Sequence, residues 1–341
     1  MYIAISFILF ILLFFLPFLP GVIELFRKED AEPLFISMDY IRNPRYFGKA
    51  FKRLLHRATA GFTLSPGVRD IKLSKDEKVE LAHSINISAE SQINRILYVI
   101  GEFVSGGRAR FTKEVYVTDN AVIGRDNILQ AFAGDMDVAV GKGTQFLRWL
   151  DAEGEIRIEE GCNLGINASS GGRLIIGREC LFRRLFGMPI VTGQDYNAGE
   201  YNKEMPLSFP ETLSLPSAFI RKKDSYIPPG TIFDGNIVFT HDVLIGSGTV
   251  IKGDIKCYGK IVLQENVIIE GNIFADKDII VGQNARIWGH VFSQMSVYIS
   301  EKTVVSCLDK IKSVIGKKSI SIEQGVIIYG FVTTEGEGRT V

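Results

Sequence analysis

Pairs of aliphatic residues separated by one position recur along most of the chain, usually at a step of about 18 residues. Two steps are longer, before Val138 and before Ile320, and a still longer gap separates Ile176 from Val243. The pairs are Val79/Leu81, Leu97/Val99, Val115/Val117, Val138/Val140, Ile156/Ile158, Leu174/Ile176, Val243/Ile245, Ile261/Leu263, Ile279/Val281, Val297/Ile299 and Ile320/Ile322. Short alternating strands that repeat at a fixed length predict an all-β fold, a parallel β-helix with about 18 residues per coil.

A second column of the same period begins four coils with glycine, a polar residue and an aliphatic residue. The copies are Gly235-Asn236-Ile237, Gly253-Asp254-Ile255, Gly271-Asn272-Ile273 and Gly289-His290-Val291. We expect them to stack at one corner of the coil, where a positive φ is least costly for glycine. His290 is then interpreted as a solvated corner residue. Cys162 and Cys180 are separated by the same step and should stack in the core as two thiols.

The first segment, residues 2–19, reads YIAISFILFILLFFLPFL and carries no charge. As a helix it would be roughly 27 Å long, close to the thickness of a bilayer core. It lacks a basic start and a small-x-small site, so a cleaved signal peptide is not expected. Residues 1–20 are therefore predicted to be a transmembrane anchor. Basic residues follow the segment and none precedes it, which predicts single-pass insertion in the inner membrane, with the amino terminus outside and the body cytoplasmic.

Residues 21–60 are predicted to be a juxtamembrane segment that contains a short basic amphipathic helix. In NPRYFGKAFKRLLHRA, residues 43–58, apolar residues recur at steps of three and four. The basic residues that we expect to bind anionic lipid are Arg42, Arg45, Lys49, Lys52, Arg53 and Arg57. The alternative is that the apolar face of this helix packs on the end of the body. Both interpretations stay open at the level of sequence.

The body divides into four parts by its rhythm. Residues 61–191 are predicted to form amino-terminal coils, 192–229 an inserted loop, 230–335 further coils and 336–341 a tail. The loop contains prolines and charges of both signs. We interpret it as an interaction loop, for which cell-envelope proteins are candidate partners, or as an inert insertion.

Composition excludes several functions. Lysine and arginine number 39, as do aspartate and glutamate, so no net field favours nucleic acid. The four cysteines show no zinc-like spacing, and the chain has no P-loop, dinucleotide fingerprint or HExxH motif. We therefore predict no catalytic, cofactor or metal site.

Residues 230–335 resemble the bactofilins, the polymer-forming bacterial cytoskeletal proteins. The resemblance rests on VLIGSGTVIKGDI, IVLQENVIIEGNI, IIVGQNARIWGHV and ISIEQGVIIYGFV. It implies a right-handed β-helix that polymerises end to end without nucleotide, binds the inner face of the membrane and scaffolds cell-envelope enzymes. The chain departs from the family in its length, in the loop at 192–229 and in its apolar first segment.

The main rival is a left-handed hexapeptide-repeat acyltransferase, whose coils have the same length. Such an enzyme needs a general-base histidine at a coil junction. His241, in THDVLIG, lies nearest the loop, and an exposed corner is its expected place. A pectin-degrading β-helix enzyme would need stacked charges on one face, which the sequence lacks.

The last coil is predicted to be the polymerisation contact. It is followed only by GFVTTEGEGRTV, which we interpret as too short and too polar to cap a hydrophobic end. An uncapped coil would expose apolar side chains and unpaired strand edges, which drive association. The residues expected at this interface are Ile320, Ile322, Val326 and Ile328.

Overall fold

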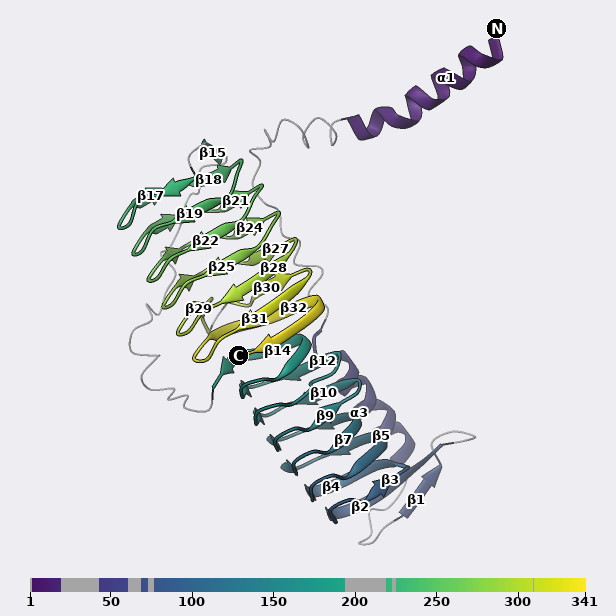
Figure 1. The fold of residues 1–341 in the computed structure, drawn as a ribbon. Helices are drawn as coiled ribbons and strands as arrows, with labels where there is room; N and C mark the ends of the chain where they lie inside the picture. The colour runs from purple at the N-terminus through teal and green to yellow at the C-terminus, as the bar shows by residue number, and fades with distance from the viewer. Residues whose placement is uncertain are drawn as a thin grey trace.

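The computed structural model describes residues 2–19, 43–60, 69–72, 77–193, 219–222, 225–308 and 310–341. It contains an amino-terminal helix, a second helix and a long β-solenoid (Figure 1). The helical elements are α1 (Tyr2–Phe15), the 3-10 helix η1 (Leu16–Phe18) and α3 (Tyr46–Thr59). The solenoid consists of two parts, which we call the amino-terminal and the carboxyl-terminal solenoid.

The amino-terminal solenoid contains the first fourteen strands. They are β1 (Arg69–Lys72), β2 (Lys78–Ile87), β3 (Gln92–Ile93), β4 (Ile96–Ser105), β5 (Arg110–Val117), β6 (Ala121–Ile123), β7 (Ile128–Gly134), β8 (Val138–Val140), β9 (Gln145–Phe146), β10 (Trp149–Ala152), β11 (Ile156–Ile158), β12 (Asn167–Ser170), β13 (Leu174–Ile176) and β14 (Leu181–Thr192). Apart from β1, which pairs antiparallel with β2, these strands pair in parallel with one another from coil to coil.

The carboxyl-terminal solenoid contains the remaining strands. They are β15 (Phe219–Lys222), β16 (Tyr226–Ile227), β17 (Ile232–Asp234), β18 (Asn236–Phe239), β19 (Val243–Ile245), β20 (Val250–Lys252), β21 (Ile255–Cys257), β22 (Ile261–Leu263), β23 (Ile268–Ile269), β24 (Ile273–Ala275), β25 (Ile279–Val281), β26 (Arg286–Ile287), β27 (Val291–Ser293), β28 (Ser296–Ile299), β29 (Val304–Val305), β30 (Lys312–Gly316), β31 (Ser319–Ile322) and β32 (Ile327–Thr340).

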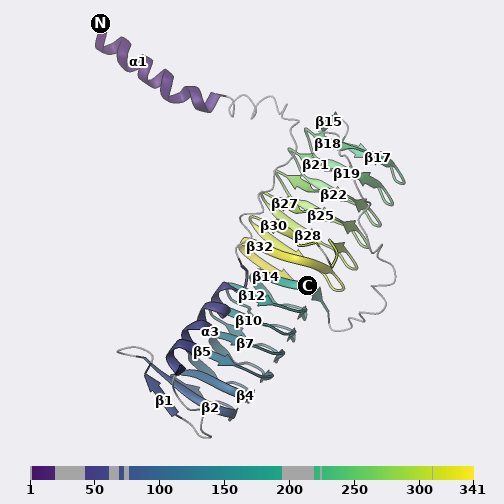
Figure 2. The same cartoon turned by 180° about the vertical axis from the view of Figure 1, so that it is seen from behind.

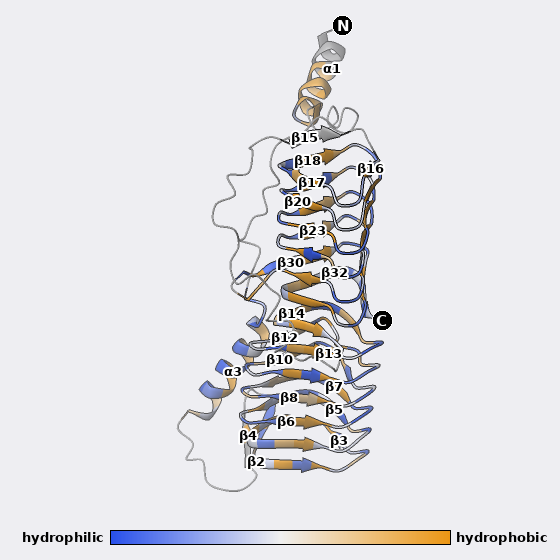
Figure 3. Ribbon diagram, turned by 90° about the vertical axis from the view of Figure 1, so that its left-hand side faces the viewer, coloured by the Kyte–Doolittle hydropathy of each residue, from blue (hydrophilic) through white to orange (hydrophobic). Residues whose placement is uncertain are grey.

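The predicted parallel β-solenoid is confirmed, and its coils have the predicted length. Ile237 pairs with Ile255, which pairs with Ile273, one coil further on. Every member of the predicted aliphatic pairs is buried, and one apolar core runs through both solenoids. In Figure 3 apolar and polar stretches alternate along the strands of both parts. The alternation arises because successive side chains of a strand point to opposite faces.

The two longer steps in the aliphatic pattern have different structural causes. Val115 pairs with Phe132, whereas Val138 pairs with Ala121, so the earlier step moves the pattern to another side of the coil. Ile320 pairs with Val297, so the later step keeps the same side and reflects extra residues between β29 and β30. The first pair also differs, because Val79 and Leu81 belong to an outer cluster that contacts α3.

The two solenoids run in opposite directions and meet at their carboxyl-terminal ends. Figures 1 and 2 show β14 beside β32 in the middle of the rod, with β2 and β17 near its two far ends. β14 and β32 pair antiparallel, whereas the strands within each solenoid pair in parallel apart from the terminal β1. A chain that simply continued its coils would have one direction throughout, so this reversal is the main architectural feature.

The prediction of a membrane-spanning helix is not supported. The continuous α-helix covers Tyr2–Phe15, and η1 follows it. Within the parts of the chain that the structure describes, no helix combines the length and apolarity needed to cross a bilayer. Pro17 lies within η1, and proline in the interior of an α-helix removes a hydrogen bond, so the helix is shorter than the apolar stretch. The predicted single-pass insertion is likewise not supported.

The boundaries of the coils also differ from the predicted ones. The loop expected at 192–229 lies largely outside the described residues, as does its suggested contact with envelope proteins. Within that range, however, Phe219–Lys222 and Tyr226–Ile227 are already strands of the first carboxyl-terminal coil. Residues 336–341 were expected to be a tail, but β32 continues to Thr340.

Candidate functional site: an internal junction, an open end and a docked helix

The junction, defined as the paired strands β14 and β32, joins the two solenoids through backbone hydrogen bonds and side-chain contacts. Leu185 lies opposite Val332, and Ile190 lies opposite Ile328. Between them Phe186 faces Phe331, with ring centroids 4.7 Å apart. Aromatic pairs at this separation stabilise an interface beyond the area they bury. The junction therefore has the character of a continuous core.

Thr192 and Thr340 form reciprocal hydrogen bonds across the junction. The Thr192 hydroxyl donates to the Glu323 carbonyl (2.6 Å) and accepts the Val326 N–H (3.0 Å). Reciprocally, the Thr340 hydroxyl donates to the Gly177 carbonyl (2.6 Å) and accepts the Cys180 N–H (3.0 Å). Each threonine thus forms hydrogen bonds with backbone groups in the last coil of the other solenoid. The contact therefore has an approximate twofold character.

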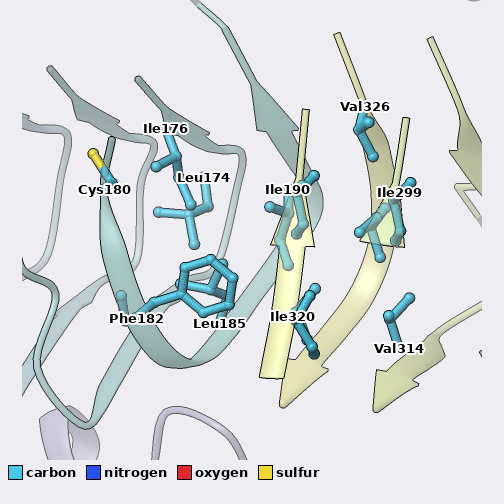
Figure 4. Packing of buried hydrophobic residues seen from close by; sticks show 14 of the residues in the cluster. Leu174, Ile176, Cys180, Phe182, Leu185, Ile190, Ile299, Val314, Ile320 and Val326 are labelled. Carbon is cyan, nitrogen blue, oxygen red and sulfur yellow. The ribbon is translucent and has the colours of Figure 1, made fainter. Parts of the chain in front are cut away.

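The side chains inside the junction are fully enclosed. Figure 4 shows Phe182 and Ile190 of β14 in the same core as Ile320 of β31. A Cβ on Gly338 would lie 2.2 Å from the Phe182 ring, so only glycine allows β32 to approach that ring. The junction accordingly depends on small and large residues that match across two distant segments.

The residues expected to form a polymerisation interface lie in this enclosed region. Ile320, Ile322, Val326 and Ile328 are all buried. The premise that their coil is uncapped is wrong, because residues 331–340 complete a strand that pairs with β14. Within a single copy of the chain, these side chains are not accessible to a partner.

The open ends of the rod lie elsewhere. In the first carboxyl-terminal coil, β16 pairs only with β19 and β17 only with β20 among the described strands. Ile232 of β17 is 72% exposed and Tyr226 of β16 is 49% exposed. At the opposite end of the rod, β1 pairs with β2 and covers part of the edge. Unpaired edges beside exposed apolar residues are typical association sites.

Helix α3 packs on the outer face of the amino-terminal solenoid, across β4, β5, β7, β10 and β12 (Figure 2). Phe51 and Leu55 are buried against Tyr98, Tyr116 and Trp149. The Phe51 ring lies 5.8 Å from the Trp149 ring and 6.1 Å from that of Tyr116. Burial of apolar and aromatic area explains this position. The structure therefore shows the apolar face of this helix packed on the body, but along its side and not on its end as the packing interpretation expected.

An ion-pair cluster fixes the start of α3. The Arg45 guanidinium donates to both carboxylate oxygens of Asp151 at 2.9 Å and also binds Glu153. Ser169 donates to Asp151 at 2.7 Å. Burial alone would lower the pKa of Arg45, but the hydrogen bonds to Asp151 and Glu153 raise it above its ordinary value. A Cβ on Gly48 would collide with Asp151, so glycine permits this close approach.

The basic residues of this segment therefore divide into two groups. Arg45 is bound to Asp151, and the Lys52 amino group lies 2.7 Å from Asp135. Lys49, Arg53 and Arg57 are exposed, beside the exposed apolar side chains of Tyr46, Phe47 and Leu54. Arg42 lies outside the described residues. The outward face of α3 thus combines cations with apolar groups.

The four glycines of the Gly-polar-aliphatic column (Gly235, Gly253, Gly271 and Gly289) are required for a different physical reason from the predicted one. Only Gly235 has a positive φ (128°) among them. A Cβ on Gly253, Gly271 or Gly289 would instead lie 2.2–2.3 Å from the carbonyl of the glycine one coil earlier. Close backbone approach between coils, and not turn geometry, is what excludes side chains here.

The polar residues of that column form a hydrogen-bonded ladder. Asn236 Oδ1 accepts the Asp254 N–H at 2.8 Å, and Asn272 Oδ1 accepts the His290 N–H at 2.8 Å. His290 Nδ1 accepts the Ser313 N–H at 3.1 Å. His290 is only 5% exposed, so its interpretation as a solvated residue is wrong. Burial, with a smaller effect of Lys312, lowers the pKa of His290 to about 4, which keeps Nδ1 available as an acceptor.

The remaining candidate chemical groups lie apart from one another. His241 is exposed and its ring shares a hydrogen bond with Thr240 (2.9 Å). Cys162 and Cys180 are buried free thiols, as predicted, and the hydrogen bond between them together with burial raises the pKa of Cys162. Over the described ranges, no three potential ligands among histidine, cysteine, aspartate and glutamate converge on a metal position. The described surface thus offers contacts for association.

Sequence reasoning missed the junction residues, above all Thr192, Gly338 and Thr340. A signal was present, because Val332, Thr334, Gly338 and Thr340 are buried at alternate positions of β32, with one break at the exposed Gly336. That period of two is typical of a strand with one covered face.

Comparison with known proteins identifies one part of the chain. Residues 225–333 match the family model Bactofilin, described as polymer-forming cytoskeletal. No curated protein and no solved structure matches the chain. The match covers about a third of the sequence and falls within the carboxyl-terminal solenoid. The resemblance seen in the sequence is confirmed, and we call residues 225–333 the bactofilin domain.

Proposed function

We propose that this protein is a self-assembling cytoskeletal scaffold that associates with the cytoplasmic face of the inner membrane and organises cell-envelope machinery there. The bactofilin domain supports polymer formation, since that is the property by which its family is described. The role in envelope organisation rests on the same family resemblance. The observation that carries the proposal is the open first coil of that domain.

Self-association through this coil follows from its unpaired strands. β16 and β17 have hydrogen-bonding partners on one side only among the described strands. A second copy that added its own edge would satisfy these groups and cover Ile232. The other end of the bactofilin domain is joined to β14 within the same chain. Assembly in this proposal therefore uses the outer coils and leaves the junction intact.

Ile232→Glu tests this contact. The side chain is 72% exposed, so the charge should leave folding unchanged while it repels a stacked partner. We expect purified full-length protein in mild detergent to sediment as filaments without nucleotide, and the variant to lose most of this fraction. Ile166→Glu is the matched control, since Ile166 is also exposed but lies away from the open coil. Equal sedimentation of both variants and wild type would contradict an end contact at β17.

Membrane association is supported by the two helices. The described apolar side chains of α1 and η1 are 41–68% exposed, so the described part of the protein leaves much of their surface uncovered. Lipid is the solvent that would cover such a surface at least cost. The exposed cations and apolar groups of α3 could then rest on anionic headgroups, each cation contributing about 1 kcal/mol.

Vesicle flotation separates the two contributions. Deletion of residues 2–19 should abolish flotation with neutral vesicles and reduce it with anionic ones. Arg53→Ser with Arg57→Ser should weaken binding only to anionic vesicles, and more so at low salt. Flotation that is unchanged by the deletion would refute a lipid-binding role for α1.

A further inference from the structure

One outer face of the bactofilin domain carries an uninterrupted apolar column. Its five members come from successive coils, each paired with the next in register: Tyr226, Leu244, Val262, Ile280 and Tyr298. In the three central strands the stripe residue lies between two core-facing residues, and Tyr226 and Tyr298 are exposed. We call this column the stripe. Outward positions of a solvated sheet face are normally polar, so the stripe requires an explanation.

The same face of the amino-terminal solenoid lacks such a column. The column continues through Ser321 and Arg339, across the junction to Leu181. Beyond it lie Gln92, Arg110, Ile128, Gln145 and Asn163, of which only one is apolar. The rod therefore presents one continuous face that is polar in one half and apolar in the other. The members of both columns are exposed or half-buried, so the apolar composition of the stripe indicates that something covers it.

The order of side chains in the stripe is close to a palindrome. Large aromatic residues stand at both ends, Leu244 and Ile280 occupy the next positions, and Val262 is central. Under a twofold axis at Val262, each side chain would meet one of its own size class. Twofold contacts between identical subunits are isologous and need self-complementary surfaces of this kind.

We infer that the stripe is a lateral contact between two antiparallel copies of the bactofilin domain. The inference rests on the proposed self-assembly, because five side chains bury far less than the roughly 800 Å² per partner of a stable interface. Rods joined end to end would present many stripes at once, and the combined contact would then hold.

Two observations favour a second copy over lipid. First, the exposed residues that border the stripe in sequence carry both signs, so the border has no net positive charge to attract an anionic bilayer: Asp242, Glu265 and Glu301, with Lys277 and Lys302. Lys277 pairs with Asp242 at 3.4 Å. Second, a column with one side chain every ~4.8 Å interdigitates best with a surface of the same period. Another β-solenoid supplies that period.

Charge substitution tests the lateral contact in the full-length protein. Val262→Lys places a cation at the centre of the stripe, and Val122→Lys is its matched control. Val122 is likewise the outward valine at the centre of a short strand, β6, and at 50% exposure it is more exposed than the half-buried Val262. We expect Val262→Lys to lower the bundles that pellet at low speed by at least about tenfold, while filaments still pellet at high speed. Val122→Lys should behave as wild type.

Cross-linking tests the antiparallel geometry, in a Cys307→Ser background because the other cysteines are buried. With a short bismaleimide, Val262→Cys should form dimers by itself. Tyr298→Cys should do so only when mixed with Tyr226→Cys, because two Tyr298 positions would lie ~19 Å apart.

The outcomes separate this inference from the proposed function. Filaments whose bundling is equal in Val262→Lys and wild type would overturn the stripe contact alone. Absence of filaments in wild type would overturn the proposed function. Val262→Cys dimers no more abundant than those of Val122→Cys would overturn the stripe contact whether or not filaments form.

Discussion

The two solenoids use the same coil but stabilise it by different means. The carboxyl-terminal solenoid is regular, because the glycine column and the hydrogen-bonded ladder of polar residues repeat over several coils. The amino-terminal solenoid has register shifts between β2 and β4 and between β5 and β7, and part of its outer face is covered by α3. Arg45, from outside the solenoid, neutralises the buried Asp151.

This difference shows that strict repetition and an added helix are alternative ways to complete the same coil. In the regular half, each coil provides the hydrogen-bond partners and buried contacts of the next coil, as in other solenoids whose stability comes from adjacent repeats. In the irregular half, part of the sheet has an apolar outer side that α3 covers together with Ile71 of β1. The junction links the two, so damage in one half should reach the other through β14 and β32.

The largest effect is expected when the link between the halves is broken. Ile328→Arg places a charge in the closed core of the junction, where no partner is available, and should lower the free energy of unfolding by roughly 4–5 kcal/mol or more. Chemical denaturation of the full-length protein measures it, and separate transitions for the two halves are expected. The control Ile166→Arg, at an exposed site, should change stability little. An unchanged midpoint for Ile328→Arg would mean that the halves do not join in solution.

The second-largest effect is expected when the Arg45 guanidinium is removed, because this should destabilise the amino-terminal solenoid. Arg45→Met leaves the Asp151 carboxylate buried without its cation, at a cost of about 3 kcal/mol. Arg53→Met, on the exposed side of the same helix, serves as control. The addition of Asp151→Leu to Arg45→Met should restore part of the loss. If both arginine variants unfolded alike, the buried ion pair would have no structural role.

A methyl group in the glycine column should have an intermediate effect on the regular half. In Gly271→Ala the Cβ would lie 2.3 Å from the Gly253 carbonyl, so neighbouring coils must separate, which costs about 1–3 kcal/mol. Gly172→Ala is the control, because its Cβ would find its nearest atom at 3.4 Å, an ordinary contact. Thermal denaturation followed by circular dichroism compares the two. Equal melting temperatures would show that the coils can move apart freely.

The smallest effect concerns pH. The folded protein holds the pKa of His290 at about 4, whereas an unfolded imidazole titrates near 6.5. Between these values the unfolded chain binds more protons, so the free energy of unfolding should fall as pH drops from about 6.5 toward 4, by at most ~3 kcal/mol and, after screening by solvent, by about 1 kcal/mol.

His290→Asn should remove this contribution, because the amide oxygen can still accept the Ser313 N–H and does not titrate. Urea denaturation at pH 7 and pH 4.5 gives the slope, with the exposed His241→Asn as control. A slope that survives His290→Asn would assign the pH dependence to other groups.

Much of the solenoid was predictable because each coil appears in the sequence as a short pattern that repeats one coil later. The step from Val243 to Val297 fixes strand register one coil at a time, and the structure reproduces that register. The reversal between the halves was not predictable in this way, since a long gap after Ile176 permits either direction. The pairing of β14 with β32 joins residues far apart in the sequence, such as Ile190 and Ile328, which no local period records.

The candidate surfaces were predicted less well for a related reason. The pattern of α3 is amphipathic whether it rests on lipid or on protein, and only the three-dimensional position of Asp151 shows why Arg45 turns inward. Likewise, the last coil looked uncapped because its cap comes from β14, far away in the sequence. Contacts between distant segments decide which of several physically sound interpretations applies.

The reversal at the junction also constrains how this rod can change in length. Because both outer ends begin a solenoid and neither ends one, a duplicated coil can be added inside either half without altering β14 or β32. Each added coil would lengthen the rod by ~4.8 Å and leave the centre unchanged. The two halves of the rod can therefore lengthen independently, while the junction between them keeps the same structure.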